Sequence, residues 1–217
     1  MKKSIDTFWE LNLGALEKQL VKNGFDVYQA ESADAAKRVV LEEIFPQIQP
    51  KSVSWGGSAT FASTGLHRAF RADENLEVLN VWKSSLSSEE SAEMQRQALL
   101  VDCFFCGTNA ITEDGCLVNL DMVGNRVGGI TFGPRNVVIL ASRNKVVPDL
   151  QRAMDRIKEY VAPMNAMRLG MKTPCAKTGR CMDCDSPDRI CNVWTISEKS
   201  YPKGRIKVVL INEDLGL

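Results

Sequence analysis

The feature that most constrains the fold is a regular alternation of short apolar runs with amphipathic stretches along most of the chain. Residues 101–106 and 136–142 are continuous apolar runs, which are typical of strands buried on both faces. Further strands are predicted at residues 25–29, 51–55, 76–82, 193–197 and 205–212, and helices at 5–21, 32–45, 60–70, 87–100 and 148–161. This order predicts an α/β fold with a mostly parallel sheet and helices on both faces.

Short-range signals define several element ends. Ser87 and Glu90 have the spacing of a capping box, which predicts a helix start at residue 87. Asp114-Gly115 favours the tip of a β-hairpin. Pro46 is expected to end the helix that Ser32 begins, because proline has no amide hydrogen to donate.

Length and composition limit the classes of function. A chain of 217 residues with 25% charged residues fits one sizeable domain, and we expect residues 1–217 to form it. The formal net charge is zero and the sequence pI is about 6.6, so no overall field attracts nucleic acid or an anionic membrane. No apolar stretch approaches the roughly 20 residues needed to span a bilayer. The first residues carry no secretory pattern, and we therefore expect a cytoplasmic protein.

Four cysteines near the C-terminus form the clearest candidate metal site. Residues 172–192 contain the spacing C-x5-C-x2-C-x6-C in a segment rich in proline, glycine and aspartate, which reads as a cysteine-rich insertion before the last strands. Four thiolates suit an iron–sulfur cluster or zinc. Redox-active thiols and inert cysteines remain alternatives. With His67 as the single histidine, a histidine-rich metal site is excluded. The candidate metal ligands are Cys175, Cys181, Cys184 and Cys191.

Two glycine-rich stretches follow predicted strands, where open α/β sheets bind ligands. The first comprises residues 54–60, where paired glycines allow a ligand to approach the backbone and hydroxyl groups add donors. Tight packing between strand and helix is the alternative reading. The candidate ligand-binding residues of this stretch are Gly56, Gly57, Ser58 and Thr60.

The second stretch, residues 106–134, is long and rich in glycine and asparagine, and such loops are more often functional than not. Arg126 has the planar fork that grips a carboxylate or phosphate. Glu113 is a weak candidate for a catalytic carboxylate, with an exposed turn residue as the alternative. The candidate ligand-binding residues here are Gly107, Thr108, Asn109, Asn125, Arg126, Gly128 and Gly129.

Several motifs resemble the LUD-domain family of lactate utilization proteins. They are G-T-N-A-I-T-E-D-G-C-L-V-N-L-D, G-N-R-V-G-G and N-V-V-I-L-A-S, while T-P-C-A-K-T-G-R-C-M-D-C resembles a cysteine-bearing branch of the family. The resemblance implies a fold like that of ribose-5-phosphate isomerase, glucosamine-6-phosphate deaminase and CoA transferases. It also implies a role in oxidising L-lactate to pyruvate beside iron–sulfur partner subunits.

One difference from the isomerases of that fold limits the chemistry. They carry a G-A-D motif whose aspartate transfers protons, whereas this chain has Gly107-Thr108-Asn109. An amide does not accept a proton at neutral pH, so Asn109 and Asn125 are expected to orient a ligand by hydrogen bonds.

These observations support two classes of function. The first is an accessory or electron-transfer component of lactate oxidation, with an iron–sulfur cluster on the four cysteines, a small anionic ligand at the glycine loops, and redox subunits as partners. Neither glycine stretch has the G-x-G-x-x-G dinucleotide pattern, so hydride chemistry would come from elsewhere. The second is an isomerase-like or transferase-like enzyme stapled by zinc, acting on a phosphorylated or CoA-linked substrate with Glu113 or Asp121 as its carboxylate. A ligand sensor without catalysis is a third reading.

Overall fold

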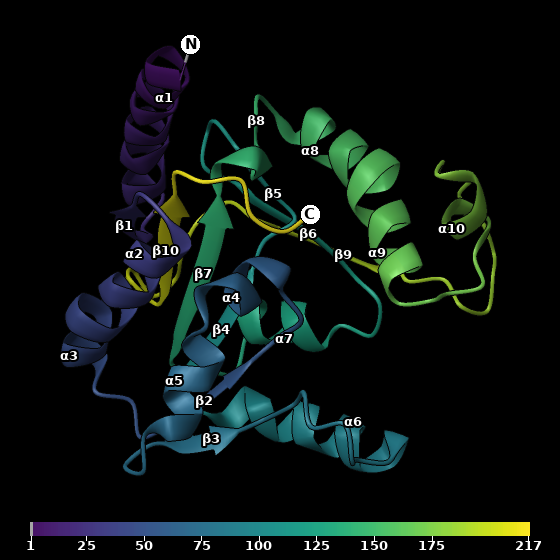
Figure 1. The fold of residues 1–217 in the computed structure, drawn as a ribbon, viewed down its shortest axis with the longest axis horizontal. Helices are drawn as coiled ribbons and strands as arrows, with labels where there is room; N and C mark the ends of the chain where they lie inside the picture. Colours follow the sequence, from purple (N-terminus) through teal and green to yellow (C-terminus); the bar gives the residue numbers. More distant parts are fainter. Residues whose placement is uncertain (1) are drawn as a thin grey trace.

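The computed structural model describes residues 2–217, and a six-stranded parallel sheet forms its centre (Figure 1). Every neighbouring pair of strands in this sheet runs parallel. In spatial order the strands are β1 (Asp26–Ala30), β10 (Ile206–Ile211), β7 (Asn136–Ser142), β4 (Cys103–Gly107), β2 (Ser52–Trp55) and β3 (Glu77–Leu79). The predicted α/β class with a mostly parallel sheet is confirmed.

Side chains of the central strands alternate between two cores. In β4, Phe104 and Cys106 face one core and Cys103 and Phe105 face the other. The helices α1 (Lys2–Lys22), α6 (Ser88–Gln97) with its last turn (Ala98–Leu100), and α7 (Asn125–Thr131) belong to the first side. The helices α2 (Ala33–Arg38), α4 (Ala59–Thr64) and α5 (Leu66–Ala72) cover the second. Helices therefore cover both faces, as predicted.

A second, four-stranded sheet packs beside the main one, and it was not predicted as a separate layer. Its order is β8 (Val146–Val147), β5 (Ala110–Thr112), β6 (Leu117–Asp121) and β9 (Val193–Ser197). The predicted hairpin is present: β5 and β6 are antiparallel, and Gly115 at the tip has a φ of 86°. Such an angle favours glycine. Helix α8 (Leu150–Arg156) packs on this sheet through Ala153.

Two long helices each continue past a proline, Pro46 in the first and Pro163 in the second. Pro46 was expected to end the first helix. The first runs through α2, a π-helical segment (Val39–Ile44) and α3 (Phe45–Ile48), with Pro46 inside its last part. The second runs through α8, a π-helical segment (Ile157–Val161) and α9 (Ala162–Arg168), which includes Pro163. In each, the residue before proline donates its N–H to a carbonyl five residues back. The widened turn makes room for the proline ring, so the prediction for Pro46 was wrong.

Two further predicted elements differ in extent. The helix expected over residues 60–70 is divided at Gly65, whose φ of 70° interrupts the helical hydrogen bonds. The strand expected over 76–82 is limited to β3, since Trp82 leaves the sheet to pack against Trp55, Phe61 and His67, with ring centroids 5.4–5.7 Å away. His67 is therefore a packing histidine, and burial is the main cause that lowers its pKa.

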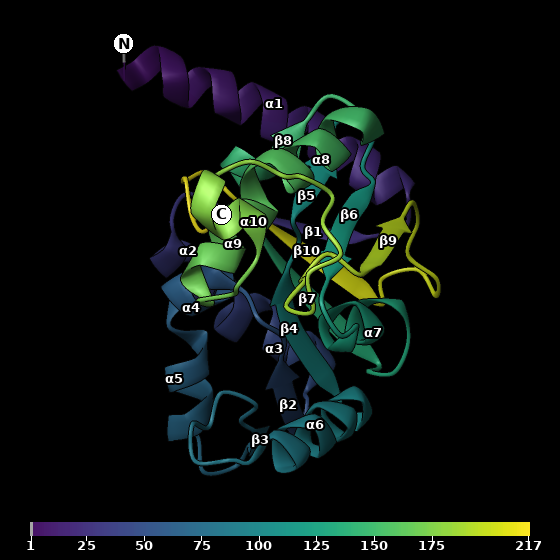
Figure 2. The same ribbon diagram turned by 90° about the vertical axis from the view of Figure 1, so that its right-hand side faces the viewer.

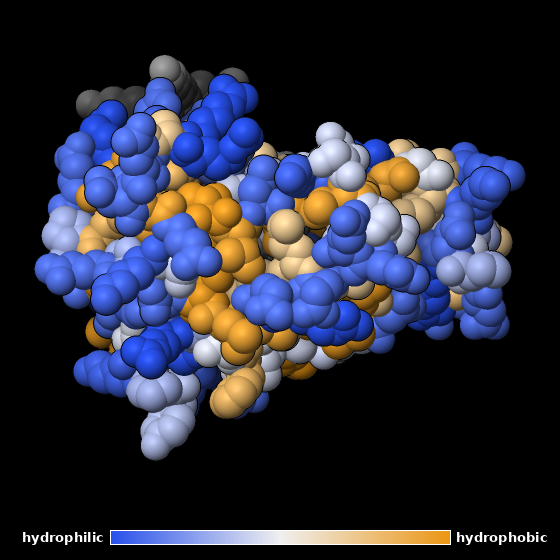
Figure 3. Space-filling model, turned by 90° about the horizontal axis from the view of Figure 1, so that it is seen from below, coloured by the Kyte–Doolittle hydropathy of each residue, from blue (hydrophilic) through white to orange (hydrophobic). Residues whose placement is uncertain are grey.

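The cysteine-rich segment lies at the side of the molecule. It begins with α10 (Pro174–Thr178), which contacts α9, and continues as a loop to β9 (Figures 1 and 2). Seen from below, the molecule presents an apolar area bordered by polar residues (Figure 3). Phe132 and Leu100 are among the most exposed apolar side chains, at 85% and 78%. No described helix is both long and apolar enough to cross a membrane.

The close packing of α7 on β4 makes Gly129 sensitive to substitution. A Cβ atom at Gly129 would lie 2.7 Å from the buried Phe104 ring. We expect Gly129→Ala to lower the free energy of unfolding by about 1–3 kcal/mol, because either the helix or the buried ring must shift to admit the methyl group. Urea denaturation measures this change.

Gly128→Ala is the matched control, since a Cβ there lies 3.7 Å from Leu99, an ordinary contact. Alanine also favours the helix by about 1 kcal/mol. Equal free energies of unfolding of the two variants would show that contact with Phe104 does not explain why residue 129 is glycine.

Candidate functional site

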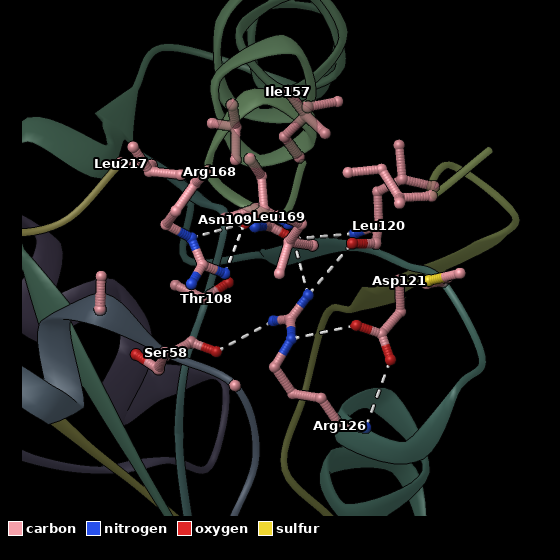
Figure 4. A pocket seen from close by; sticks show the side chains of 18 of the residues that line it. Ser58, Thr108, Asn109, Leu120, Asp121, Arg126, Ile157, Arg168, Leu169 and Leu217 are labelled. Carbon is pink, nitrogen blue, oxygen red and sulfur yellow. Dashed lines mark hydrogen bonds and ion pairs between the residues drawn. The ribbon is translucent and has the colours of Figure 1, made fainter. Parts of the chain in front are cut away.

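A cavity of about 290 Å³ lies at the carboxyl ends of β2 and β4, between the main sheet and the helix formed by α8 and α9. This is the edge at which ligands bind to open α/β sheets. Its walls combine polar groups with apolar side chains such as Trp82, Leu120 and Ile157 (Figure 4). Of the eleven predicted ligand-binding residues, seven line it: Gly57, Ser58, Gly107, Thr108, Asn109, Asn125 and Arg126.

The other four predicted residues lie behind the wall. Cβ atoms at Gly56 and Gly129 would collide with Arg126 and Phe104 respectively. Gly128 faces Leu99. Thr60 is fully buried and takes part in the hydrogen bonding of a wall residue, described below. These positions shape the cavity without lining it.

Arg126 is at the centre of a hydrogen-bond network under the cavity (Figure 4). Its Nε donates to Asp121 Oδ1 at 3.3 Å, and both side chains are largely buried. Its two Nη atoms donate to Asn119 Oδ1 at 2.6 Å, Asn109 Oδ1 at 2.8 Å, and the carbonyls of Gly107 and Leu120. All five guanidinium N–H groups are thus used inside the protein. Arg126 acts as an internal clamp, and its fork is not directed at a ligand.

The asparagines of the predicted loop are also partly committed. Asn109 Oδ1 accepts hydrogen bonds from Arg126 and from the amide of Leu120, 2.9 Å away. Asn119 Oδ1 accepts from the amide of Asn109 as well as from Arg126. Asn119 was not among the predicted ligand-binding residues, although it lies in the predicted glycine- and asparagine-rich stretch. Together these amides fix the position of the loop after β4.

Glu113 lies outside the cavity. It is exposed at the tip of the β5–β6 hairpin, where its amide donates to the carbonyl of Val147. Asp121, the other carboxylate considered, does line the cavity but is paired with Arg126.

Two cations in the cavity wall were absent from the sequence prediction. Lys145 is 5% exposed, and its Nζ donates to Thr60 Oγ1 at 2.7 Å. Burial, and then the charges of Arg156 and Arg126, lower the pKa of Lys145 to about 7. Arg168 lies at the end of α9, and its guanidinium points into the cavity toward Thr108 (Figure 4). Lys145 follows β7 by three residues, a position that strand-end reasoning could have found. Arg168 had no such signal.

The four predicted metal ligands come together in one small pocket. Cys175, Cys181, Cys184 and Cys191 all line it, and all are free thiols. Burial is the first cause that raises the pKa of Cys191, and the neighbouring Cys181 and Cys175 add to it. Arg189 holds the loop closed by donating to the carbonyls of Cys184 and Cys191.

The pocket does not have the geometry of a finished metal centre. Within residues 2–217, no three histidine, cysteine, aspartate or glutamate side chains are placed to hold one ion. Its volume of about 20 Å³ is near that of one or two water-sized spheres. The donor set nevertheless fits a metal that prefers thiolate ligands, since four thiols share one pocket, Cys175 from α10 and the other three from the irregular loop that follows it. Ala162 and Ile190 line both this pocket and the cavity.

The fold and site define an α/β protein with a cation-lined cavity at the carboxyl edge of a parallel sheet. The protein-family model of the LUD domain matches residues 13–211, so the chain belongs to the LUD-domain family. A DUF162 family protein from Deinococcus radiodurans shares its fold, with a TM-score of 0.52 and 12% identity over 94% of this chain and 98% of that one. Ribose 5-phosphate isomerase A from Methanocaldococcus jannaschii matches less well, with a TM-score of 0.40 and 15% identity over 86% and 99%. No curated protein matches the chain significantly.

The exposed Gly57 allows the ligand role of its loop to be separated from packing. A Cβ there has no atom within 4 Å, so Gly57→Val adds a side chain to the cavity mouth without a collision. We expect the free energy of unfolding to change by less than about 0.5 kcal/mol. Binding of pyruvate or sulfate, measured by calorimetry, should weaken by about tenfold, which corresponds to about 1.4 kcal/mol.

Gly56→Ala provides the contrast, because its Cβ would lie 2.8 Å from Arg126 Cγ and destabilise the fold. Unchanged affinity in Gly57→Val would assign the glycine pair to packing alone.

Proposed function

We propose that this protein is an accessory or electron-transfer component of L-lactate oxidation to pyruvate, with an iron–sulfur cluster on Cys175, Cys181, Cys184 and Cys191. Membership of the LUD-domain family, which includes lactate utilization proteins, supports the pathway. The observation that carries the proposal is the common wall of Ala162 and Ile190 between the thiol pocket and the cavity. A redox centre on these thiols would lie one side chain away from a bound ligand.

The charges around the thiols favour a centre rich in thiolate. Lys158 and Arg189 border the pocket and both contact Asp183, at 2.7 and 3.0 Å. One carboxylate therefore offsets only one of the two cations, and the remaining positive charge opposes the burial that raises the pKa of Cys191. The four cysteines would hold the cluster, which would supply one-electron chemistry, and Arg189 fixes the loop through the carbonyls of Cys184 and Cys191.

Exposed apolar side chains provide a candidate binding surface for partner subunits of the lactate-oxidising system. Phe132 and Leu100 are largely exposed, and the apolar area of Figure 3 is bordered by polar groups. Such an arrangement is typical of protein interfaces. Iron–sulfur redox subunits are the partners we propose, in the cytoplasm.

One observation favours a second candidate. A pocket of about 20 Å³ accommodates a single ion with little movement, whereas a multi-iron cluster requires the loop to open. Zinc on the four cysteines would then be structural. The protein would act on a phosphorylated or CoA-linked substrate as an isomerase-like or transferase-like enzyme, or sense such a ligand without catalysis.

Replacing the central pair of cysteines tests the metal site. We expect Cys181→Ser with Cys184→Ser to lose all bound metal after anaerobic purification, because serine oxygens are poor ligands for soft metals. Cys116→Ser is the control, since Cys116 lies outside the pocket. Metal analysis and visible absorbance are the measurements.

The wild-type spectrum separates the two candidates. Absorbance that bleaches on reduction indicates a cluster, and stoichiometric zinc without colour indicates the second candidate. Full metal content in the double variant, or none in the wild type, would contradict both.

A further inference from the structure

The cavity contains more positive than negative charge. Lys145 and Arg168 line it, and Arg156 lies close enough to Lys145 to affect its titration. Asp121 also lines it, but its carboxylate is paired with Arg126. Leu217, the last residue of the sequence, also lines the cavity, but no carboxylate is among the charges that act on Lys145. Among the described residues that line the cavity, no side-chain carboxylate is therefore left to neutralise Lys145.

The surroundings of Lys145 show why it needs an external partner. Thr60 of α4 accepts one of its three N–H bonds, while Thr60 Oγ1 itself donates to the carbonyl of Leu215. The charged or titratable groups that act on it are Arg156 of α8, Arg126 of α7 and Cys106 of β4, and burial keeps Cys106 a neutral thiol by raising its pKa to about 12. On its own segment, Arg143 is paired with Asp214 at 3.0 Å. A protonated Lys145 is thus buried among cations and lacks a counter-ion.

Arg168 offers a second contact in a fixed orientation. Its Nε and one Nη donate to Asn165 Oδ1, at 3.0 and 2.7 Å, which holds the guanidinium plane. The opposite edge of the fork points into the cavity (Figure 4). A planar fork with a free edge matches a carboxylate, and the apolar side chains Leu120, Ile157 and Val161 suit a small organic body.

We propose that Lys145 and Arg168 bind the carboxylate of a small organic acid in this cavity, and that Lys145 takes up a proton as the acid binds. The carboxylate supplies the counter-ion that the buried ammonium lacks, so the bound state favours the charged amine. The inference uses the same cavity as the proposed function but does not require a metal on the cysteines.

The direction of the pH dependence follows from linkage. The pKa of Lys145 is about 7 in the free protein and rises when an anion binds beside it. Above pH 7, binding must therefore protonate the amine, and affinity falls with rising pH by up to about tenfold per unit. Below pH 7 the amine is already charged, and affinity becomes independent of pH.

Calorimetry with pyruvate as the probe tests the proposal, because pyruvate does not titrate near neutral pH. Titrations at pH 8 in imidazole and in Tris, whose ionisation enthalpies differ, give the number of protons taken up. We expect about one proton per pyruvate. Pyruvamide, which has no carboxylate, should bind at least tenfold more weakly. Equal binding of pyruvamide, sulfate binding without pyruvate binding, or no proton uptake would overturn the proposal.

Variants assign the proton to Lys145. Lys145→Met should weaken pyruvate binding by at least tenfold at pH 7 and abolish proton uptake. Arg168→Met should weaken binding but keep the uptake, while Arg152→Met, an exposed arginine outside the cavity, should change neither. Lys145→Met that binds pyruvate and takes up a proton like the wild type would refute the assignment.

Two further measurements remove ambiguity. The pKa of Lys145 is lowered in the folded state. The free energy of unfolding of the wild type should therefore increase relative to that of Lys145→Met as the pH rises from about 7 toward the ordinary lysine pKa of 10.5. If Lys145→Met does not fold, the wild type and Arg168→Met still decide the question. Proton-linked binding should persist in the Cys181→Ser, Cys184→Ser variant, so a failed metal site leaves this inference standing.

Discussion

The buried Arg126 clamp is the interaction on which the geometry of the site depends. Its guanidinium joins the end of β4, through the Gly107 carbonyl, to the β5–β6 hairpin, through Asn109 and Asn119. It therefore fixes the main sheet against the small one. A buried charge is costly unless it is paired and all its donors are used, and here both conditions hold. The clamp also explains why residue 56 is glycine, since a Cβ atom there would collide with Cβ and Cγ of Arg126.

Because Arg126 is satisfied internally, the cavity above it takes its free charge from other parts of the chain. Lys145 comes from the segment after β7, and Arg168 comes from the end of α9. The long continuous helix is what delivers Arg168. Without the π-helical turn before Pro163, the helix would end at Ala162, nearly two turns earlier, and the guanidinium of Arg168 would not be placed at the cavity. A π-helical turn in the same position likewise allows the first helix to continue past Pro46.

The elements that could be predicted are those whose signals are local. β7 has the predicted bounds, the capping box of Ser87 and Glu90 is formed, and the turn at Gly115 closes the hairpin. The second sheet could not be foreseen, since its strands β5 and β6 pair with residues 35 positions and 72 or more positions further along the chain, respectively. For the site, strand-end glycines indicated the right edge of the sheet. Sequence alone could not tell that Arg126 is enclosed by Asn109, Asn119 and Asp121, because that depends on which polar groups the fold brings around it.

The relation between the cavity and the thiol pocket follows from the same helix. Ala162 of α9 and Ile190 of the cysteine loop separate them, so the two sites share a wall of small and aliphatic side chains. Lys158, one turn earlier, borders the thiols, whereas Arg168 faces the cavity from the other end of the helix. One rigid element thus places a cation at each site. An anion in the cavity and thiolates in the pocket would each be offset locally, so that occupying one site need not impose an electrostatic penalty on the other.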